Sequence, residues 1–397
     1  MPSTSSPLPG HLHRSPVPAA RTDGARRRAA PAGASRLAGR HVLVVGLDRG
    51  DERTAVARHT SGLVDHLGAQ GATVTVRRRG AGADVALVTT ALTLRLPHVP
   101  DLVVAVTPGL GGAVAAARTA QRYEAPLLLV VHDLVSARPA GRYGVRGLRV
   151  AEATERRLLP RAAEVAVVNP DLGAVVRALG VPAAHVHLLP QWTALPATGP
   201  DRRTARRGLR WPEGRFTVAV PVLADGRSDP ATVLAAAALL GGEVDVVLVG
   251  DGARRALAQA PAGVASAARA AVPADDVRFR SMLAAADLVL LAQRSDPGRP
   301  CVPQTLVDSL GAGRPLLAAA PPDSAIAAEL DRTGGAGLVV RAGDPVVLAA
   351  AVRALQLDDD LREAMGAAAL RHARDRLDRR HAMSRLDRIV EAALDGR

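Results

Sequence analysis

The chain has 397 residues, of which 48% are hydrophobic and 22% charged, values typical of a soluble globular protein with room for two domains. Its single cysteine, Cys301, excludes an internal disulfide, so a reducing compartment is expected. No apolar run reaches the ~18 residues that a membrane-spanning helix needs, and no secretory signal is recognisable.

The net charge of +13 is unevenly distributed along the chain. Residues 1–40 carry seven Arg and one Asp, and residues 41–215 carry 23 Arg and 14 acidic residues. Residues 216–397 are close to balanced, with 21 Arg and 23 acidic residues. The excess in the first half suggests an anionic partner there, such as an anionic membrane surface. A solvated Arg-rich surface is the alternative.

The first 39 residues are rich in Pro, Ser, Ala and Arg without periodicity, which predicts a disordered basic tail at 1–39. From His41 onward, short apolar runs alternate with amphipathic segments. The expected strands are 41–47, 72–77, 84–89, 101–106, 127–132, 164–168 and 185–189. The expected helices are 54–70, 110–124, 147–159 and 171–179. Continuously apolar strands separated by helices indicate a parallel sheet covered on both faces.

A segment rich in proline and arginine, 191–214, is expected to connect this first domain, 40–190, to a second one, 215–376. The second set of strands is expected near 216–221, 244–249, 287–292, 315–320 and 337–340. Its helices are expected near 230–240, 252–260, 280–286, 302–311, 322–332, 344–356 and 358–376. A last helix, 378–394, lies within the C-terminal segment 377–397. The fold class is therefore α/β, with two Rossmann-like doubly wound domains.

Residues 302–318, VPQTLVDSLGAGRPLLA, combine a helix, a glycine turn and a buried strand. Pro303 suits the first turn of a helix, and Gly311 and Gly313 supply its end. The strand that follows is continuously apolar, as in a buried parallel sheet. Asp308 lies on this helix near a predicted strand-end crevice, where α/β proteins bind nucleotides.

Polar residues also follow other predicted strands at their carboxyl ends. His132 and Asp133 close the strand at 127–132, and Gly250 and Gly252 follow the strand at 244–249. Glycine lets a ligand approach the backbone closely. Asp251 is expected to cap the helix that begins there.

Two further segments are candidates for binding an anion. Residues 107–113, TPGLGGA, form a glycine-rich strand-to-helix turn, for which packing of a tight turn is the alternative. Four arginines would share one helix face if their segment is helical, and with residues 77–79 they would form a basic patch. They are Arg138, Arg142, Arg146 and Arg149. The histidines show no zinc-ligand spacing, and no aromatic residues are interleaved with the basic ones as in a nucleic-acid site.

Five blocks in order resemble family 4 glycosyltransferases, closest to the colanic-acid and capsule branch. They are 43–76, 101–134, 187–192, 246–252 and 302–318. The resemblance implies the GT-B fold, two Rossmann-like domains that face a central cleft. The sequence departs from the family pattern at Pro300, where the first Glu of a Glu-x7-Glu pair is expected, and at Thr305, where the branch usually has Lys.

The resemblance also implies roles for individual residues. His132 would contact the donor sugar as the catalytic residue, and Asp308 would hold ribose hydroxyls in place of the second Glu. The donor-binding set is Arg227, Gly250, Gly252, Thr305 and Asp308. The acceptor-side set is Glu52, Gly109, Arg142 and Arg146. Within the loop 221–229, Arg227 stands at the position of the cation that contacts the diphosphate.

The expected function is that of a retaining glycosyltransferase, which moves a hexosyl group from a nucleotide diphosphate sugar to a cell-surface glycan or lipid-linked acceptor. The donor would be UDP- or GDP-linked, with no cofactor and no metal. The partners would be this donor, the acceptor and an anionic membrane, but no nucleic acid, and the location cytoplasmic at the inner membrane face. The alternatives are a catalytically degenerate GT-B protein that binds nucleotide sugar or a partner transferase, and a nucleotide-sugar epimerase.

Overall fold

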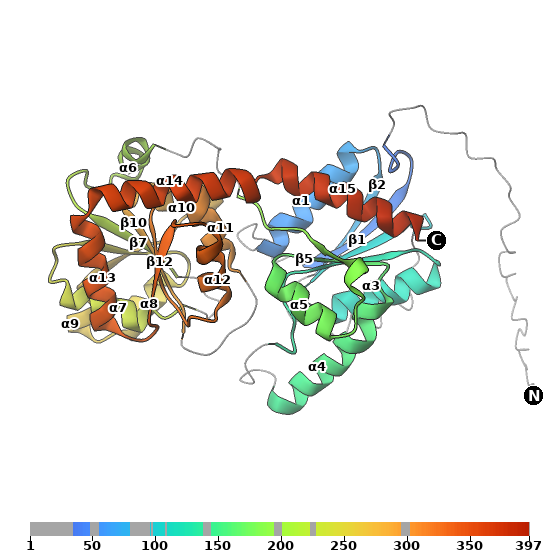
Figure 1. The fold of residues 1–397 in the computed structure, drawn as a ribbon, viewed down its shortest axis with the longest axis horizontal. Coiled ribbons are helices and arrows are strands. Elements are labelled where there is room, and N and C mark those ends of the chain that lie inside the picture. Colours follow the sequence, from blue (N-terminus) through green and yellow to red (C-terminus); the bar gives the residue numbers. More distant parts are fainter. Residues whose placement is uncertain are drawn as a thin grey trace, which may run out of the picture. The chain divides into compact units, whose positions relative to one another are not determined.

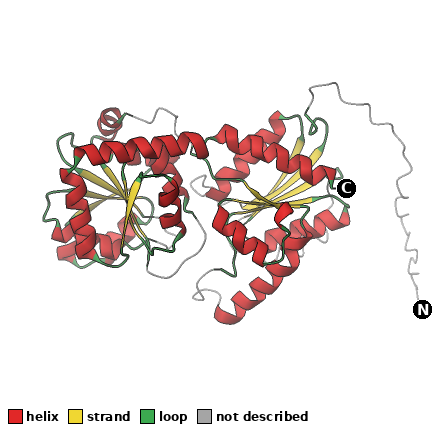
Figure 2. Ribbon diagram, in the orientation of Figure 1, coloured by secondary structure: helices red, strands yellow, loops and turns green. Residues whose placement is uncertain are grey.

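The computed structural model describes residues 35–47, 55–79, 96, 98–107, 109–137, 144–193, 201–222, 228–294 and 302–396. Leu37–Arg397 form one compact unit, to which everything below refers. Its described elements build two parallel α/β sheets, drawn in Figures 1 and 2. No described helix is long and apolar enough to span a membrane.

The N-terminal sheet has, among the described residues, six parallel strands in the order β2-β1-β3-β4-β5-β6. These strands are β1 (His41–Leu47), β2 (Thr73–Arg79), β3 (Leu102–Val106), β4 (Leu127–Val131), β5 (Glu164–Val167) and β6 (Val186–Leu188). Its helices are α1 (Ala55–Ala69), α3 (Leu110–Arg122), α4 (Gly144–Leu158) and α5 (Pro170–Ala178), with 3-10 turns η1 (Leu159–Arg161) and η2 (Ala183–His185). The strand order reverses between β1 and β3, so ligand sites are expected at the carboxyl ends of these strands.

The C-terminal sheet repeats this plan in the order β12-β11-β10-β7-β8-β9. The strands are β7 (Thr217–Pro221), β8 (Asp245–Val249), β9 (Ala268–Ala271), β10 (Leu288–Ala292), β11 (Leu316–Ala319) and β12 (Gly337–Val340). The helices are α6 (Arg202–Leu209), α7 (Pro230–Leu239), α8 (Ala253–Gln259), α9 (Ala262–Ala265), α10 (Asp276–Ala285), α11 (Gln304–Gly311), α12 (Ala325–Arg332), α13 (Pro345–Leu357) and α14 (Asp359–Arg376). Here the order reverses between β7 and β10.

Both sheets are buried on both faces, which explains why the central strands are apolar at every position. In the N-terminal sheet, one face packs against α1 and the other against α3, α5 and the end of α4. In the C-terminal sheet, one face packs against α10, α11 and α12 and the other against α7, α8 and α13. The predicted α/β class with two doubly wound sheets is therefore confirmed.

The last helix, α15 (Arg379–Asp395), follows the C-terminal sheet in sequence but packs on the N-terminal one. Met383, Leu386, Ile389 and Val390 are buried in the same core cluster as residues of β1 and α1. The predicted apolar face of 378–394 thus covers, beside α1, a further part of the same sheet face. This packing ties the two ends of the described chain to one core.

Several predicted elements differ from the observed ones. The segment 191–214 is not a plain connection, because Asp201 caps the eight-residue helix α6. Arg206 of α6 donates to Asp287 at 2.5 Å and to the Ala285 carbonyl at 2.8 Å, and so anchors the helix on the C-terminal half. The helix expected at 280–286 begins earlier, at Asp276, because Asp275 accepts from the Arg278 N–H at 2.7 Å.

Two elements, α9 and β9, are only four residues long each, too short for the sequence pattern to indicate them. β9 is an edge strand that is only half-buried. The strand expected at 84–89 lies outside the described residues.

Candidate functional site

A pocket opens at the carboxyl end of β8, beside the N-terminus of α11. We name it the α11 pocket. It is lined by Gly250, Asp251, Pro273, Asp276, Phe279, Gln304, Thr305 and Asp308. Three residues of the predicted donor set therefore meet in one place: Gly250, Thr305 and Asp308.

Gly250 turns the chain out of β8 into the pocket wall. Its φ of +131° lies in a region that L side chains rarely adopt, so glycine is required here. Its N–H donates to the Ala271 carbonyl at 3.1 Å, which holds the turn against β9. Gly252 follows as the N-cap of α8 and donates its N–H to the Val222 carbonyl at 3.0 Å.

The expected capping role of Asp251 is wrong. The N-cap of α8 is Gly252, one residue after Asp251, and glycine has no side chain with which to cap the helix. The chain reaches its helical conformation one residue later than expected, because the positive φ of Gly250 first carries it across the end of β8. Asp251 instead contributes to the wall of the α11 pocket.

Helix α11 is buried along its whole length, which makes it a rigid support for the pocket. Pro303 is its N-cap, in an extended conformation, rather than a residue of the first turn. The helix ends at Gly311, where an added Cβ would lie 2.2 Å from Oγ1 of Thr193. Close packing on every side fixes the direction in which Asp308 points.

The Asp308 carboxylate is already engaged within the protein. Its Oδ1 accepts from Nη1 of Arg58, on α1, at 2.8 Å and from Nε2 of Gln304 at 3.2 Å. Burial raises the pKa of Asp308, while the Arg58 guanidinium opposes this rise. The group is only 2% exposed, so the ion pair is shielded from solvent.

Arg58 contacts a second carboxylate in the same pocket. Its Nη2 donates to Oδ2 of Asp276 at 2.8 Å, and Arg280 donates to the same oxygen at 2.6 Å. Burial alone would lower the pKa of Arg58, but the two carboxylates outweigh it and the pKa is raised. Arg58 is therefore a permanently charged residue that links α1 to α10 and α11.

The other predicted key residue, His132, lies in an aromatic cluster. It follows β4 and is 2% exposed, with its ring edge-on to that of His59 at 4.4 Å between centroids. The His59 ring in turn stacks on Trp192 at 4.1 Å. We call His59, His132 and Trp192 the histidine cluster. Gly62 makes room for it, because a Cβ there would lie 2.4 Å from the Trp192 ring.

Both imidazoles of the histidine cluster are neutral at pH 7. Burial lowers the pKa of His132 to about 3. Burial, and then the neighbouring His132, lower the pKa of His59 well below its usual value. Neither ring nitrogen of His132 has a hydrogen-bond partner among the described residues. A neutral imidazole of this kind offers one N–H donor and one acceptor nitrogen to a ligand.

The histidine cluster and the α11 pocket are joined by hydrogen bonds. Gln304 Nε2 donates to the Trp192 carbonyl at 3.2 Å as well as to Asp308. Gln191 Nε2 donates to the Val302 carbonyl, also at 3.2 Å. The segment around Trp192 therefore holds the start of α11 in place, and Arg58 and His59 are neighbours on α1.

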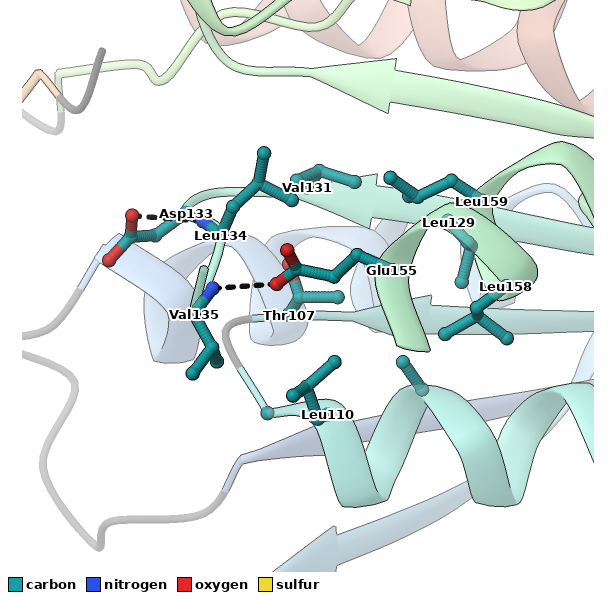
Figure 3. A pocket seen from close by; sticks show the side chains of 12 residues that line it. Thr107, Leu110, Leu129, Val131, Asp133, Leu134, Val135, Glu155, Leu158 and Leu159 are labelled. Carbon is teal, nitrogen blue, oxygen red and sulfur yellow. Dashed lines mark hydrogen bonds between the residues drawn. The ribbon is translucent and has the colours of Figure 1, made fainter. Parts of the chain in front are cut away.

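A second, small pocket lies in the N-terminal half (Figure 3). It opens where β3 and β4 end, against α3 and α4, and contains the predicted acceptor-side residue Gly109. We call it the Glu155 pocket after the buried carboxyl group in its wall. Asp133, which follows His132 in the chain, lines it as well.

The remaining predicted site residues are distributed as follows. Arg146 is exposed on α4, together with Arg149. Arg227, Glu52 and Arg142 lie outside the described residues, as do Arg138 and Pro300. Among the described residues, no group of three His, Cys, Asp or Glu side chains could hold a metal ion.

Sequence reasoning missed Arg58, His59, Trp192, Gln304 and Asp276. Trp192 is one of only two tryptophans in the chain, a signal that could have marked it. Arg58 and Asp276 carry no such signal, because their pairing joins residues 218 positions apart.

Residues 41–192 match the model of the glycosyl transferase 4-like domain. No curated protein matches the sequence. Among solved structures, HepE of Anabaena, crystallised with UDP and glucose, is 18% identical with a TM-score of 0.65, over 89% of this chain and 100% of that one.

Sucrose-phosphate synthase of Thermosynechococcus elongatus is 16% identical with a TM-score of 0.72, over 88% of this chain and 98% of that one. WaaG, a glycosyltransferase involved in lipopolysaccharide biosynthesis, is 17% identical with a TM-score of 0.63, over 88% of this chain and 99% of that one. These likenesses extend over both sheets and establish the fold. The chain has the GT-B fold, and its match to a glycosyl transferase 4-like domain indicates a glycosyltransferase.

Proposed function

We propose that the protein is a retaining glycosyltransferase that transfers a hexosyl group from a UDP- or GDP-linked donor to a glycan or lipid-linked acceptor. The observation that carries this proposal is the α11 pocket, which gathers Gly250, Thr305 and Asp308 at the carboxyl end of a parallel strand. Such strand ends are where open α/β sheets bind nucleotides. The reaction would need no cofactor and no metal, as expected from the sequence.

The charges of the α11 pocket favour the nucleoside end of the donor. Asp251, Asp276 and Asp308 line it, and carboxylates accept hydrogen bonds from hydroxyl groups but repel phosphates. A ribose hydroxyl would share Asp308 with Arg58 or displace one of its present donors. The diphosphate would lie toward the loop that carries Arg227, as the sequence resemblance implies.

His132 would contact the transferred sugar from the N-terminal half. Its neutral state means that it can donate a hydrogen bond to a sugar hydroxyl without bringing a charge into the site. His59 and Trp192 would hold the ring in position through their stacked contact. The chain of contacts through Gln304 to Asp308 would then couple the sugar and nucleoside ends of the donor.

The acceptor would be presented at the inner face of the cell membrane, to which the protein would bind peripherally. Helix α4 supports this proposal, since it exposes Val145 at 61% and Val150 at 66% beside Arg146 and Arg149. Apolar and basic side chains on one exposed helix suit an anionic lipid surface. Co-sedimentation with anionic vesicles should fall when Arg146 and Arg149 are both replaced by Glu, and should stay low with neutral vesicles.

Incubation with a panel of UDP- and GDP-sugars, with extracted lipids as acceptors, tests the proposal. The expected result is release of free nucleotide that depends on the acceptor and is lost in His132→Ala. Proton NMR of the product should show that the anomeric configuration of the donor is kept. Absence of turnover with every donor and acceptor would contradict the proposal.

A second function is favoured by the buried Arg58–Asp308 ion pair, which occupies the carboxylate expected to hold the ribose. We infer as the alternative a catalytically degenerate GT-B protein that binds nucleotide sugar, or a partner transferase, without turnover. Thermal shift with UDP, GDP and their sugars distinguishes the two: stabilisation without turnover supports the alternative. An epimerase would instead release nucleotide and isomerised sugar without an acceptor.

A further inference from the structure

Asp308, the residue expected to hold the ribose of the donor, is closed off in this structure. It lies in the wall of the α11 pocket but is only 2% exposed. A ribose hydroxyl reaches so deeply covered a carboxylate only when one of the side chains that cover it moves. The residues in contact with Asp308 therefore decide whether the site is open or closed.

Arg58 is the contact of Asp308 that is free to withdraw from α11. Arg58 and Gln304 both donate to Oδ1 of Asp308, at 2.8 Å and 3.2 Å. Gln304 lies one turn away on the same helix, whose residues Leu306 and Leu310 are fully buried in the core of the C-terminal sheet. Arg58 instead reaches Asp308 from α1, which packs on the N-terminal sheet. Its side chain can therefore leave without any change in α11.

Both carboxylates that Arg58 contacts have a second donor on their own helix. Asp276 accepts from Arg280 of α10 at 2.6 Å, at the same oxygen that Arg58 contacts at 2.8 Å. Asp308 keeps its hydrogen bond from Gln304. If a ribose hydroxyl takes the place of Arg58 at Asp308, neither carboxylate is left buried without a donor. The exchange of Arg58 for a ribose therefore avoids the large cost of an isolated buried charge.

Gln304 provides an additional acceptor beside Asp308. Its Nε2 donates to Asp308 and to the Trp192 carbonyl, which fixes the orientation of the amide. Its Oε1 is buried and has no hydrogen-bond partner among the residues that the structure describes. A buried acceptor without a partner costs stability. A ribose carries two neighbouring hydroxyl groups, and thus one donor for Asp308 and one for this oxygen.

We propose that Arg58 is an autoinhibitory latch: it occupies the ribose position at Asp308 while the donor site is empty, and the ribose of the nucleotide displaces it. This rests on the proposed function and adds the residue that opposes nucleotide binding. Because nucleotide binds only when Arg58 is displaced, the measured affinity is lowered by the fraction of molecules in which the latch is closed.

Isothermal titration calorimetry of the full chain with UDP and with GDP tests the latch. We expect Arg58→Met to bind the nucleotide that the wild type binds about tenfold more tightly, because Asp308 is then uncovered. The direction of the change is decisive. An arginine that contacted the phosphates would instead weaken binding when removed, since the nucleotide is an anion.

Two further variants separate the latch from other effects of the substitution. Arg58→Lys keeps the positive charge but lacks the planar fork that reaches two carboxylates, so we expect binding about threefold tighter than in the wild type. Arg332→Met removes an arginine of α12 that also pairs across to the N-terminal half, with Asp171 at 3.3 Å, but at an exposed position. We expect R332M to leave nucleotide affinity unchanged. Thermal denaturation reports the fold of each variant.

A double-variant comparison assigns the effect to Asp308. In the Asp308→Asn background, we expect R58M to leave nucleotide affinity unchanged, because no carboxylate remains for Arg58 to cover. Nucleotide binding that is equal or weaker in R58M and R58K than in the wild type refutes the latch and leaves the proposed function standing. Equal tightening in R332M refutes it as well, since it indicates general loosening. A chain that binds neither nucleotide in any variant refutes the proposed function and the latch together.

Discussion

Two clusters that share helix α1 show opposite ways of burying polar groups. Arg58 enters an ionic cluster with Asp308 and Asp276, while its neighbour His59 enters the neutral histidine cluster with His132 and Trp192. In the first, the two carboxylates raise the pKa of Arg58 and keep it charged, while Arg58 opposes the rise that burial causes in the pKa of Asp308. In the second, no counter-charge is present, so burial drives the imidazoles to their neutral forms.

The two clusters therefore depend on different physical conditions. Removing either partner of a buried ion pair lowers the stability of the protein, because the remaining charge is then buried alone. A neutral cluster depends instead on close packing and on pH. Substitutions in each cluster therefore have different expected effects on stability.

Arg58→Met should cost the largest stability, about 3 kcal/mol, because it leaves the Asp308 carboxylate buried without its cation. Urea unfolding measures the loss. Adding Asp308→Leu to R58M should restore much of it, since the double variant buries no isolated charge. Arg146→Met, at an exposed position, is the matched control and should change stability by less than about 0.5 kcal/mol. A loss of the same small size in R58M would refute the ionic account.

Gly62→Ala should cost about 2 kcal/mol, because the new Cβ would lie 2.4 Å from the Trp192 ring and force the stack apart. Gly68→Ala lies on the same helix with nothing within 4 Å of the added Cβ. It should stabilise the protein by about 0.5–1 kcal/mol through the better helix propensity of alanine. Equal unfolding midpoints for G62A and G68A would mean that the histidine cluster is not tightly packed.

The neutral state of His132 predicts a pH dependence of stability. Its pKa of about 3 in the folded protein lies below the unfolded value of about 6.5, so the unfolded chain binds more protons between these limits. Stability should therefore fall as pH drops below about 6.5, by at most about 1.4 kcal/mol per pH unit for this residue. His132→Phe should remove that part of the slope in urea titrations from pH 7 to 4. H381Q, at an exposed histidine, controls for loss of an imidazole.

The smallest effect concerns the helix caps. Asp275→Ala removes a carboxylate that caps α10 and should cost about 1 kcal/mol. Asp275→Asn keeps an oxygen that can accept the Arg278 N–H and should cost less than about 0.5 kcal/mol. Thermal unfolding of both variants checks the ranking, and equal losses in D275A and D275N would contradict the capping role.

Much of the fold could be predicted because it depends on local patterns. Strands β1, β3, β4, β7, β8, β10 and β11 are apolar runs that a two-sided sheet must bury, and they lie within one or two residues of their expected bounds. Helix α6 and strand β9 were missed, because Arg-rich or half-buried segments carry little hydrophobic signal.

The candidate site could be predicted only in part. Gly250 and Asp308 were found because strand ends and glycine turns are visible in the sequence, and one pocket contains both. The partner Arg58 of Asp308 could not be predicted, because it lies 250 residues away in the chain and nothing in the sequence distinguishes it from other arginines on helices. Glu155 was missed for the same reason: its burial and its half-satisfied carboxyl group appear only once α4 packs against the segment after β4.

The sequence by itself therefore determined the two doubly wound sheets and the order of their elements, because hydrophobic periodicity is a property of residues that are neighbours in the chain. The tertiary structure decided which polar groups are charged, which are neutral and which are left without a partner. These properties depend on burial and on neighbours that the fold brings together from distant parts of the chain, as it does for Arg58, His132 and Glu155.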